Sequence, residues 1–214
     1  MKIGILGTGA VGKALARGFN GIGYEVIVGT RDARSEKAIA VAQELAGIAK
    51  VGSFAEAANF GEQIAICTLW SGTESAIELA GKSNFDGKLV IDVTNPLVFA
   101  PNAPPSLALG HTDSGGEQVQ RWLPNSHVVK AFNIVGNTDM VNPEFPGGPP
   151  DMFMGGDDAN AKKQVTEILT AFGWNTIDLG GIEASRMLEP LCILWVTYGI
   201  RTGGWRHAMK MLKK

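Results

Sequence analysis

Cysteine, charge and long apolar runs are all scarce in this sequence. Its two cysteines and three histidines share no spacing that is typical of a metal site, so we expect no bound metal. No apolar run reaches the ~20 residues that a membrane-spanning helix needs. A formal net charge of −2 provides no basic surface for nucleic acid or an anionic membrane. Because Met1-Lys2 leads directly into an apolar segment, we expect no signal peptide and a cytoplasmic location.

Glycine and short apolar segments are abundant instead. The 214 residues include 28 glycines, and 45% of all residues are hydrophobic. Apolar segments at 2–6, 25–28, 64–69, 89–93 and 128–132 alternate with helical patterns, as in a parallel sheet covered by helices. The sequence therefore predicts an α/β fold of the Rossmann type, with a doubly wound, mainly parallel sheet.

A smaller unit follows a loop rich in proline and glycine. Its pattern predicts a strand, a helix capped by Asp157 or Asp158, a second strand and a final helix that starts near Glu183. This unit is a small C-terminal α/β extension of the main sheet. We expect an NADP-binding domain at 1–141, a linking loop at 142–150 and the extension at 151–214.

The strongest motif is the glycine-rich turn Gly7-Thr8-Gly9-Ala10-Val11-Gly12. It follows a predicted strand and precedes a run of good helix formers, the context in which G-x-G-x-x-G is typical of dinucleotide binding. Gly7 makes the tight turn, Gly9 lets the backbone approach a pyrophosphate, and Gly12 allows the helix to pack closely on the strand. The N-terminus of the helix favours the negative charge of the phosphates. A glycine-rich turn without a ligand is the alternative.

The end of the second predicted strand indicates which dinucleotide binds. An NAD site would place Asp or Glu there to hold the ribose 2′-OH, but this chain has Thr30-Arg31. A guanidinium group suits a 2′-phosphate. Arg34 and Lys37 either add positive charge or form an ordinary exposed helix face, and we interpret Asp32 as the N-cap of that helix. The sequence therefore predicts NADP(H) rather than NAD(H).

Polar and aromatic residues follow three more of the predicted strands. In open α/β sheets, ligands bind just outside the carboxyl ends of the strands. The candidates are Leu69-Trp70, Asn95-Pro96 and Asn133-Ile134-Val135. Trp70 could equally cover the sheet edge, and Pro96 could simply end a strand.

Two stretches show little periodicity. They span 99–116 and 142–150, and loops of this length inside a compact domain are usually lids or mobile segments.

The last predicted helix has a wide apolar stripe. Either the protein's own sheet or a second subunit must cover it, and we expect a homodimer. With Trp205, the stripe could also line a substrate pocket. The stripe consists of Met187, Leu188, Leu191, Leu194, Trp195 and Tyr198.

Acid–base chemistry from side chains is not indicated. No Ser/Tyr-x-x-x-Lys pair follows the central strands, and Lys130 lies inside a strand, where it is a poor general acid. We therefore assign no catalytic side chain. Hydride transfer to a flavin-type ring depends on orientation and exclusion of water, because the cofactor carries the chemistry.

Several segments together resemble the deazaflavin-dependent (coenzyme F420) NADP oxidoreductases over nearly the whole chain. This family also includes dinucleotide-binding proteins without a settled substrate and the reductase domain of membrane metalloreductases. In the deazaflavin enzyme the nicotinamide-side strand ends in Ile-Pro-Trp, where this chain has Leu69-Trp70-Ser71. The matching segments are the turn 7–12, 29–32, 94–97, 129–133, 155–158, 178–180 and 185–189.

The resemblance implies roles for individual residues. Thr8, Gly9, Ala10 and Val11 would hold the pyrophosphate, and Thr30 and Arg31 the 2′-phosphate. Leu69, Trp70, Asn95 and Pro96 would flank the nicotinamide ribose, with Ala131, Phe132, Asn133 and Ile134 near the flavin-type ring. Separately from the resemblance, a dimer that pairs the last helices would bring Trp195 and Trp205 close to the hydride site, where they could shape the acceptor pocket.

The expected activity is hydride transfer between NADPH and a small-molecule co-substrate. F420 is the leading acceptor, followed by a flavin such as FMN or FAD. The alternatives are a non-catalytic NADP(H)-binding module and a reductase of a small imine or carbonyl compound. No nucleic-acid or membrane partner is expected.

Overall fold

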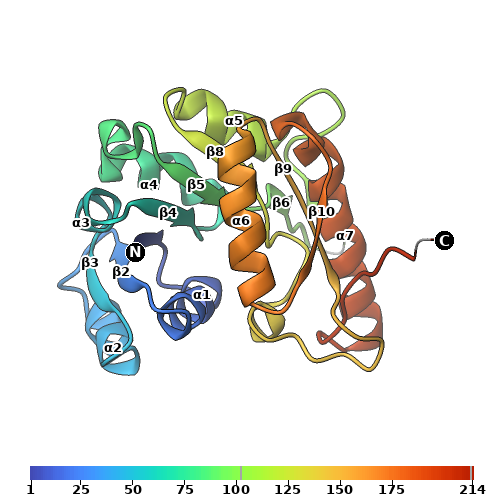
Figure 1. The fold of residues 1–214 in the computed structure, drawn as a ribbon, viewed down its shortest axis with the longest axis horizontal. Coiled ribbons are helices and arrows are strands. Elements are labelled where there is room, and N and C mark those ends of the chain that lie inside the picture. Colours follow the sequence, from blue (N-terminus) through green and yellow to red (C-terminus); the bar gives the residue numbers. More distant parts are fainter. Residues whose placement is uncertain (102, 213) are drawn as a thin grey trace.

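A computed structural model describes residues 1–101, 103–212 and 214, and its main feature is one eight-stranded sheet. The strand order is β10-β9-β8-β5-β4-β1-β2-β3, with helices packed on the sheet (Figure 1). All neighbouring pairs are parallel except β8 and β9. The predicted fold class is therefore confirmed. The strands are β1 Lys2–Leu6, β2 Glu25–Thr30, β3 Lys50–Ser53, β4 Gln63–Ile66, β5 Leu89–Asp92, β8 His127–Lys130, β9 Asp151–Gly156 and β10 Asn175–Asp178.

The strand order reverses beside β1. The chain runs from β1 outward through β2 and β3, then returns to the other side of β1 with β4, β5 and β8. Such a reversal opens a crevice at the carboxyl ends of the strands, where open α/β sheets bind ligands. The topology therefore fixes the position of the candidate site before any side chain is considered.

Short-range capping signals set where several helices begin. Ser53 and Glu56 form the capping box that starts α3. Asp158 caps α6 by accepting a hydrogen bond from the Ala161 N–H at 2.7 Å. The α-helices are α1 Ala10–Gly21, α2 Glu36–Glu44, α3 Phe54–Phe60, α4 Thr73–Ala80, α5 Gly115–Trp122, α6 Ala159–Ala171 and α7 Ser185–Thr202, and the 3-10 turns are η1 Trp70–Gly72, η2 Lys82–Phe85, η3 Asn137–Asp139 and η4 Ile182–Ala184.

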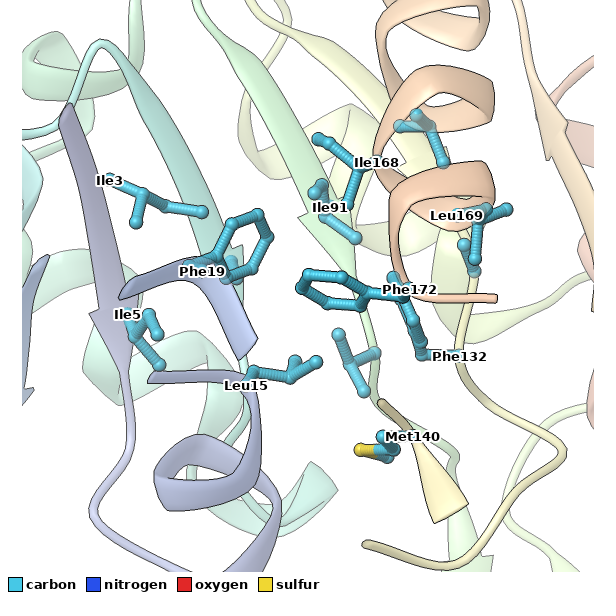
Figure 2. Packing of buried hydrophobic residues seen from close by; sticks show 14 of the residues in the cluster. Ile3, Ile5, Leu15, Phe19, Ile91, Phe132, Met140, Ile168, Leu169 and Phe172 are labelled. Atoms are coloured by element: carbon cyan, nitrogen blue, oxygen red, sulfur yellow. The ribbon is translucent and has the colours of Figure 1, made fainter. Parts of the chain in front are cut away.

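The C-terminal strands extend the main sheet rather than forming a separate one. Strand β9 pairs antiparallel with β8, and β10 pairs parallel with β9. Phe172, at the end of α6, packs against Phe19 of α1 with ring centroids 5.2 Å apart (Figure 2). One buried cluster therefore runs from Ile3 in β1 to Leu188 in α7. The division into two domains at 142–150 stays a prediction.

The aperiodic stretch at 99–116 contains part of a small hairpin. Strand β6 (Leu97–Val98) pairs antiparallel with β7 (Ser106–Leu107). Residue 102, within this stretch, lies outside the described residues. Both residues of β6, Leu97 and Val98, line the cavity described below.

The apolar residues of α7 do not form one continuous exposed stripe. Leu188 and Trp195 are buried in the protein's own core. Met187, Leu194 and Tyr198 are 59%, 61% and 55% exposed, because they lie on the opposite face of the helix. The expectation of a single stripe was therefore wrong. Among the described residues, no helix is both long and apolar enough to cross a membrane.

Candidate functional site

A cavity of about 1050 Å³ lies at the carboxyl ends of the central strands. It begins beside α2, passes the β1–α1 turn and ends between the segments that follow β4 and β5. Its walls come from six parts of the chain. The lining residues are Gly7–Val11, Arg31, Lys37, Phe54, Cys67–Gly72, Val93–Asn95, Leu97–Phe99 and Ala108.

The three glycines of the β1–α1 turn differ in what a side chain would meet at their positions. Gly7 has a φ of 128°, and a Cβ there would lie 2.6 Å from the Cys67 carbonyl oxygen. A Cβ on Gly12 would lie 2.0 Å from the Gly7 carbonyl oxygen. At Gly9 a Cβ would meet no atom within 4 Å, so the protein's own packing does not require glycine there. Gly7 and Gly12 therefore shape the turn, while Gly9 leaves its surface open to a ligand.

The N-terminus of α1 has no internal partner for its first N–H groups. Its N-cap, Gly9, has no side chain to accept them, and no acidic residue lies in the first turn. Helix α1 is 12 residues long, and its N-terminus is open to the cavity. An N-terminus of this kind favours phosphate oxygens. The residues present therefore fit a dinucleotide pyrophosphate.

The β2–α2 end of the cavity is basic. Arg31 and Lys37 line it, whereas Thr30 is half-buried and Arg34 is exposed outside the lining. Asp32 is not the N-cap of α2, as was expected. Its carboxylate instead accepts the N–H of Arg34 at 2.9 Å and so closes a tight turn before the helix. Ser35 is the cap, because its hydroxyl oxygen accepts the Ala38 N–H at 3.2 Å.

The opposite end of the cavity is apolar. Leu69 is 85% exposed and Phe99 is 65% exposed at its mouth. Trp70 stacks on Trp122 with ring centroids 5.5 Å apart, so its indole is held against α5. Burial raises the pKa of the Cys67 thiol, so this cysteine is no nucleophile at neutral pH.

Two asparagines fix the floor of this end. The Asn133 side-chain amide donates to Asn95 Oδ1 at 3.1 Å and to the Leu188 carbonyl oxygen at 2.8 Å. The Asn95 amide donates in return to the Asn133 carbonyl oxygen at 2.8 Å. Phe132, which directly precedes Asn133, has a φ of 61°. With this conformation β8 ends at Lys130, two residues earlier than expected, and Asn133 is turned toward Asn95.

Lys130 forms a fully buried charge cluster with Asp92 and Glu189. Its Nζ lies 2.7 Å from Asp92 Oδ2 and 2.9 Å from Glu189 Oε1, and it donates to the Thr94 carbonyl oxygen at 2.8 Å. The ammonium thus contacts two carboxylates and one carbonyl oxygen. Burial alone would lower the pKa of Lys130, but the two carboxylates outweigh it and raise the pKa. We call this group the Lys130 cluster.

The Lys130 cluster supports the cavity wall without lining it. The Asp92 carboxylate also accepts the Thr94 N–H at 2.9 Å, so the turn that carries Asn95 is held from two sides. The Glu189 carboxylate accepts the N–H groups of Gly115 and Gly116 at the start of α5. These contacts connect β5, β8, α5 and α7 directly behind the cavity.

The expected site residues fall into two groups. Gly7, Thr8, Gly9, Ala10, Val11, Arg31, Lys37, Leu69, Trp70 and Asn95 line the cavity. Gly12, Thr30, Arg34, Pro96, Ala131, Phe132, Asn133, Ile134, Trp195 and Trp205 do not.

The second group lies elsewhere for identifiable reasons. Phe132 and Ile134 are buried in the main core with Phe172. Trp195 packs on His207 with ring centroids 4.6 Å apart and lies near Trp205, and neither tryptophan is among the residues that line the cavity.

Some lining residues escaped the sequence interpretation. Phe54, Val98 and Ala108 lie outside the predicted strand ends and had no signal of their own. Thr68 and Thr94 did have a signal in the sequence, because they directly precede the candidates Leu69 and Asn95.

Comparison with known proteins agrees with this geometry. Residues 2–96 match the model of the family described as NADP oxidoreductase, coenzyme F420-dependent. The F420-dependent NADP reductase of Methanothermobacter marburgensis is 31% identical over 213 residues, which cover 94% of this chain and 93% of the reductase. This chain belongs to the F420-dependent NADP oxidoreductase family. It is therefore an NADP-dependent oxidoreductase.

Solved structures of this oxidoreductase family and its neighbours extend the comparison. A crystallised candidate F420-dependent NADP-reductase from Arthrobacter sp. FB24 has a TM-score of 0.92 and 34% identity, with both chains fully covered. An imine reductase from Streptomyces aurantiacus has a TM-score of 0.69 at 14% identity, and the match covers 64% of it, so this likeness concerns the fold alone.

The metalloreductase STEAP3 of Rattus norvegicus is a longer relative of the same oxidoreductase. It is 28% identical over 194 residues, but these span only 36% of its length. The remaining two thirds of that protein have no counterpart in this match, so its activity as a whole is not carried over to this chain.

Proposed function

We propose that the cavity binds NADP(H) with its phosphates at both the β1–α1 turn and the β2–α2 end. The observation that carries this proposal is that Gly9, where the surface is open, lines the same cavity as the basic residues Arg31 and Lys37. Thr8 to Val11 would hold the pyrophosphate, and Arg31 the 2′-phosphate, with half-buried Thr30 directly before it at the end of β2. The reduced nicotinamide supplies hydride.

Arg31→Ala should weaken NADPH binding while leaving NADH binding unchanged. A charge-assisted hydrogen bond to the phosphate contributes about 1.5–3 kcal/mol, so a loss of roughly 10- to 150-fold in affinity is expected. Fluorescence titration with both reduced cofactors measures it. Arg34→Ala is the matched control, because Arg34 is exposed on the same segment but outside the cavity lining. Equal affinity of the wild type for the two cofactors would contradict the proposal.

We further propose that the acceptor is a flavin-type ring, either the deazaflavin F420 or a flavin such as FMN or FAD. The support is the apolar end of the cavity, where Leu69, Trp70 and Phe99 surround the space beside Asn95. An apolar site of this kind excludes water and orients a flat ring, which is what hydride transfer between two cofactors needs.

Anaerobic oxidation of NADPH, followed at 340 nm, tests the acceptor. F420, FMN or FAD should support turnover, whereas small carbonyl and imine compounds should not. Turnover with the imines alone would instead favour the reductase alternative, whose enzymes share the fold. Tight binding of NADPH with no turnover by any acceptor would contradict the flavin-type proposal.

We also propose that the exposed face of α7 pairs with a second copy of the chain. Met187, Leu194 and Tyr198 recur at helical spacing on that face, and Leu191 between them is half-buried. Burying each such side chain stabilises by about 1.5–3 kcal/mol, and one self-complementary patch satisfies a two-fold dimer. Light scattering at micromolar concentration should report twice the 22.6 kDa of one chain. A soluble 22.6 kDa particle would exclude the dimer.

A further inference from the structure

Charge is distributed unevenly along the cavity. Among its described lining residues, only Arg31 and Lys37 carry charge, and both lie at the β2–α2 end. The other end, about Leu69 and the β6–β7 hairpin, is lined by apolar and uncharged polar groups only, within the described residues. At that end, an anionic group of the hydride acceptor would therefore meet no cation among the described lining residues.

The segments that build the apolar end lack basic residues along their whole length. No Lys or Arg occurs at 51–81 or at 89–120, although these segments contain seven acidic residues, Glu56, Glu62, Glu74, Glu78, Asp92, Asp113 and Glu117. Basic side chains on the neighbouring elements are already engaged, since Lys130 pairs with Asp92 and Glu189 behind the cavity wall. Arg121 pairs with Asp113 at 2.7 Å, and Arg186 forms a two-pronged ion pair with Glu117.

Exposed apolar groups take the place of cations at this end. Leu69, Phe99 and Val98 are 85%, 65% and 40% exposed, and they come from two different parts of the chain. Apolar side chains that converge on one cavity with so little cover are typical of a ligand site. Their natural partner is the face of an uncharged aromatic ring system.

We propose that this enzyme recognises its acceptor through the aromatic ring alone and does not bind an anionic tail. The inference rests on the proposed flavin-type activity and narrows the part of the acceptor that is recognised to its ring. In the reaction, NADPH gives a hydride, that is two electrons and one proton, to the ring, and water supplies a second proton. NADPH, H⁺ and the oxidised ring thus yield NADP⁺ and the dihydro ring.

Riboflavin and FMN form the matched pair that tests this inference, because they share one ring and differ by a phosphate. Their kcat/KM values should agree within about threefold, since no charge-assisted bond to the phosphate exists to be lost. The value for FMN should also stay constant between about 20 and 200 mM salt, where surface charges become screened. F420 and its tail-free chromophore should behave as a second such pair.

A basic residue introduced at the apolar end should create a preference for FMN over riboflavin, which the wild type is expected to lack. Leu69→Lys is expected to raise the ratio of kcat/KM for FMN over riboflavin by about tenfold, as expected for one charge-assisted contact. Leu79→Lys is the matched control, because Leu79 is an exposed leucine on α4 that does not line the cavity.

Three results would overturn the inference. A preference of the wild type for FMN over riboflavin of tenfold or more, lost at high salt, would reveal a basic site for the tail. An unchanged ratio in Leu69→Lys would mean that the ring does not bind at this end. Failure of every acceptor to oxidise bound NADPH would overturn the proposed function itself, which the first two results would leave intact.

Discussion

Lys130→Met is expected to lower the free energy of unfolding by about 3–5 kcal/mol, the usual cost of removing one partner from a buried ion pair. Methionine keeps the apolar stem but leaves Asp92 and Glu189 buried without a cation. Because the folded-state pKa of Lys130 is raised, its stabilising contribution is complete below the unfolded value of about 10.4. That contribution is lost only as the pH rises through the folded-state value. Urea unfolding at neutral pH therefore measures the whole effect.

Lys88→Met is the matched control for this loss. Lys88 donates one hydrogen bond, to the Ala58 carbonyl oxygen at 2.8 Å, and makes no ion pair within the described part of the chain. We expect a loss of about 1 kcal/mol. Equal losses in the two variants would contradict a special role for the Lys130 cluster.

Gly9→Ala is expected to weaken NADPH binding by roughly 100-fold or more, about 2.7 kcal/mol, without lowering Tm. The φ of Gly9 is −73°, which alanine adopts freely, and the added Cβ meets no protein atom within 4 Å. Its methyl group would instead occupy the surface that a pyrophosphate must approach. Fluorescence titration gives the affinity, and thermal melting of the free protein gives Tm.

Gly21→Ala provides the control for Gly9→Ala. Gly21 ends the same helix and also has open space around it, but it does not line the cavity. Both NADPH affinity and Tm should stay at the wild-type values. Gly12→Ala would be uninformative, because its Cβ would clash with the Gly7 backbone and distort the turn itself. Wild-type affinity in Gly9→Ala would exclude the β1–α1 turn as the pyrophosphate site.

Features that depend on short stretches of sequence were predictable. The β1–turn–α1 unit, the Ser53 cap and the Asp158 cap each need only a few neighbouring residues, and all are present in the structure. The position of the cavity followed from the strand order that βαβ units impose. The prediction that Asp32 caps α2 was wrong, because the Asp32 carboxylate accepts the Arg34 N–H instead. Such a local hydrogen bond competes with helix capping over the same short stretch of chain.

Contacts between distant segments were not predictable. Lys130 meets Asp92 and Glu189 only because three elements converge in space. The sequence placed Lys130 inside a strand but indicated no partner for it. The division of α7 into buried Leu188 and exposed Leu194 depends likewise on where the sheet lies, since both residues fit a helical apolar pattern.

The shared core between α1 and α6 has a consequence for how ligand binding and unfolding are coupled. Phe19 and Phe172 cover each other, so neither part of the chain keeps a closed core once the other has opened (Figure 2). Unfolding should then be a single cooperative transition. A nucleotide held at the first turn would add RT ln(1 + [L]/Kd) to the stability of every segment at once. Amide protons of α7, which forms no part of the cavity lining, would therefore exchange more slowly when the nucleotide binds.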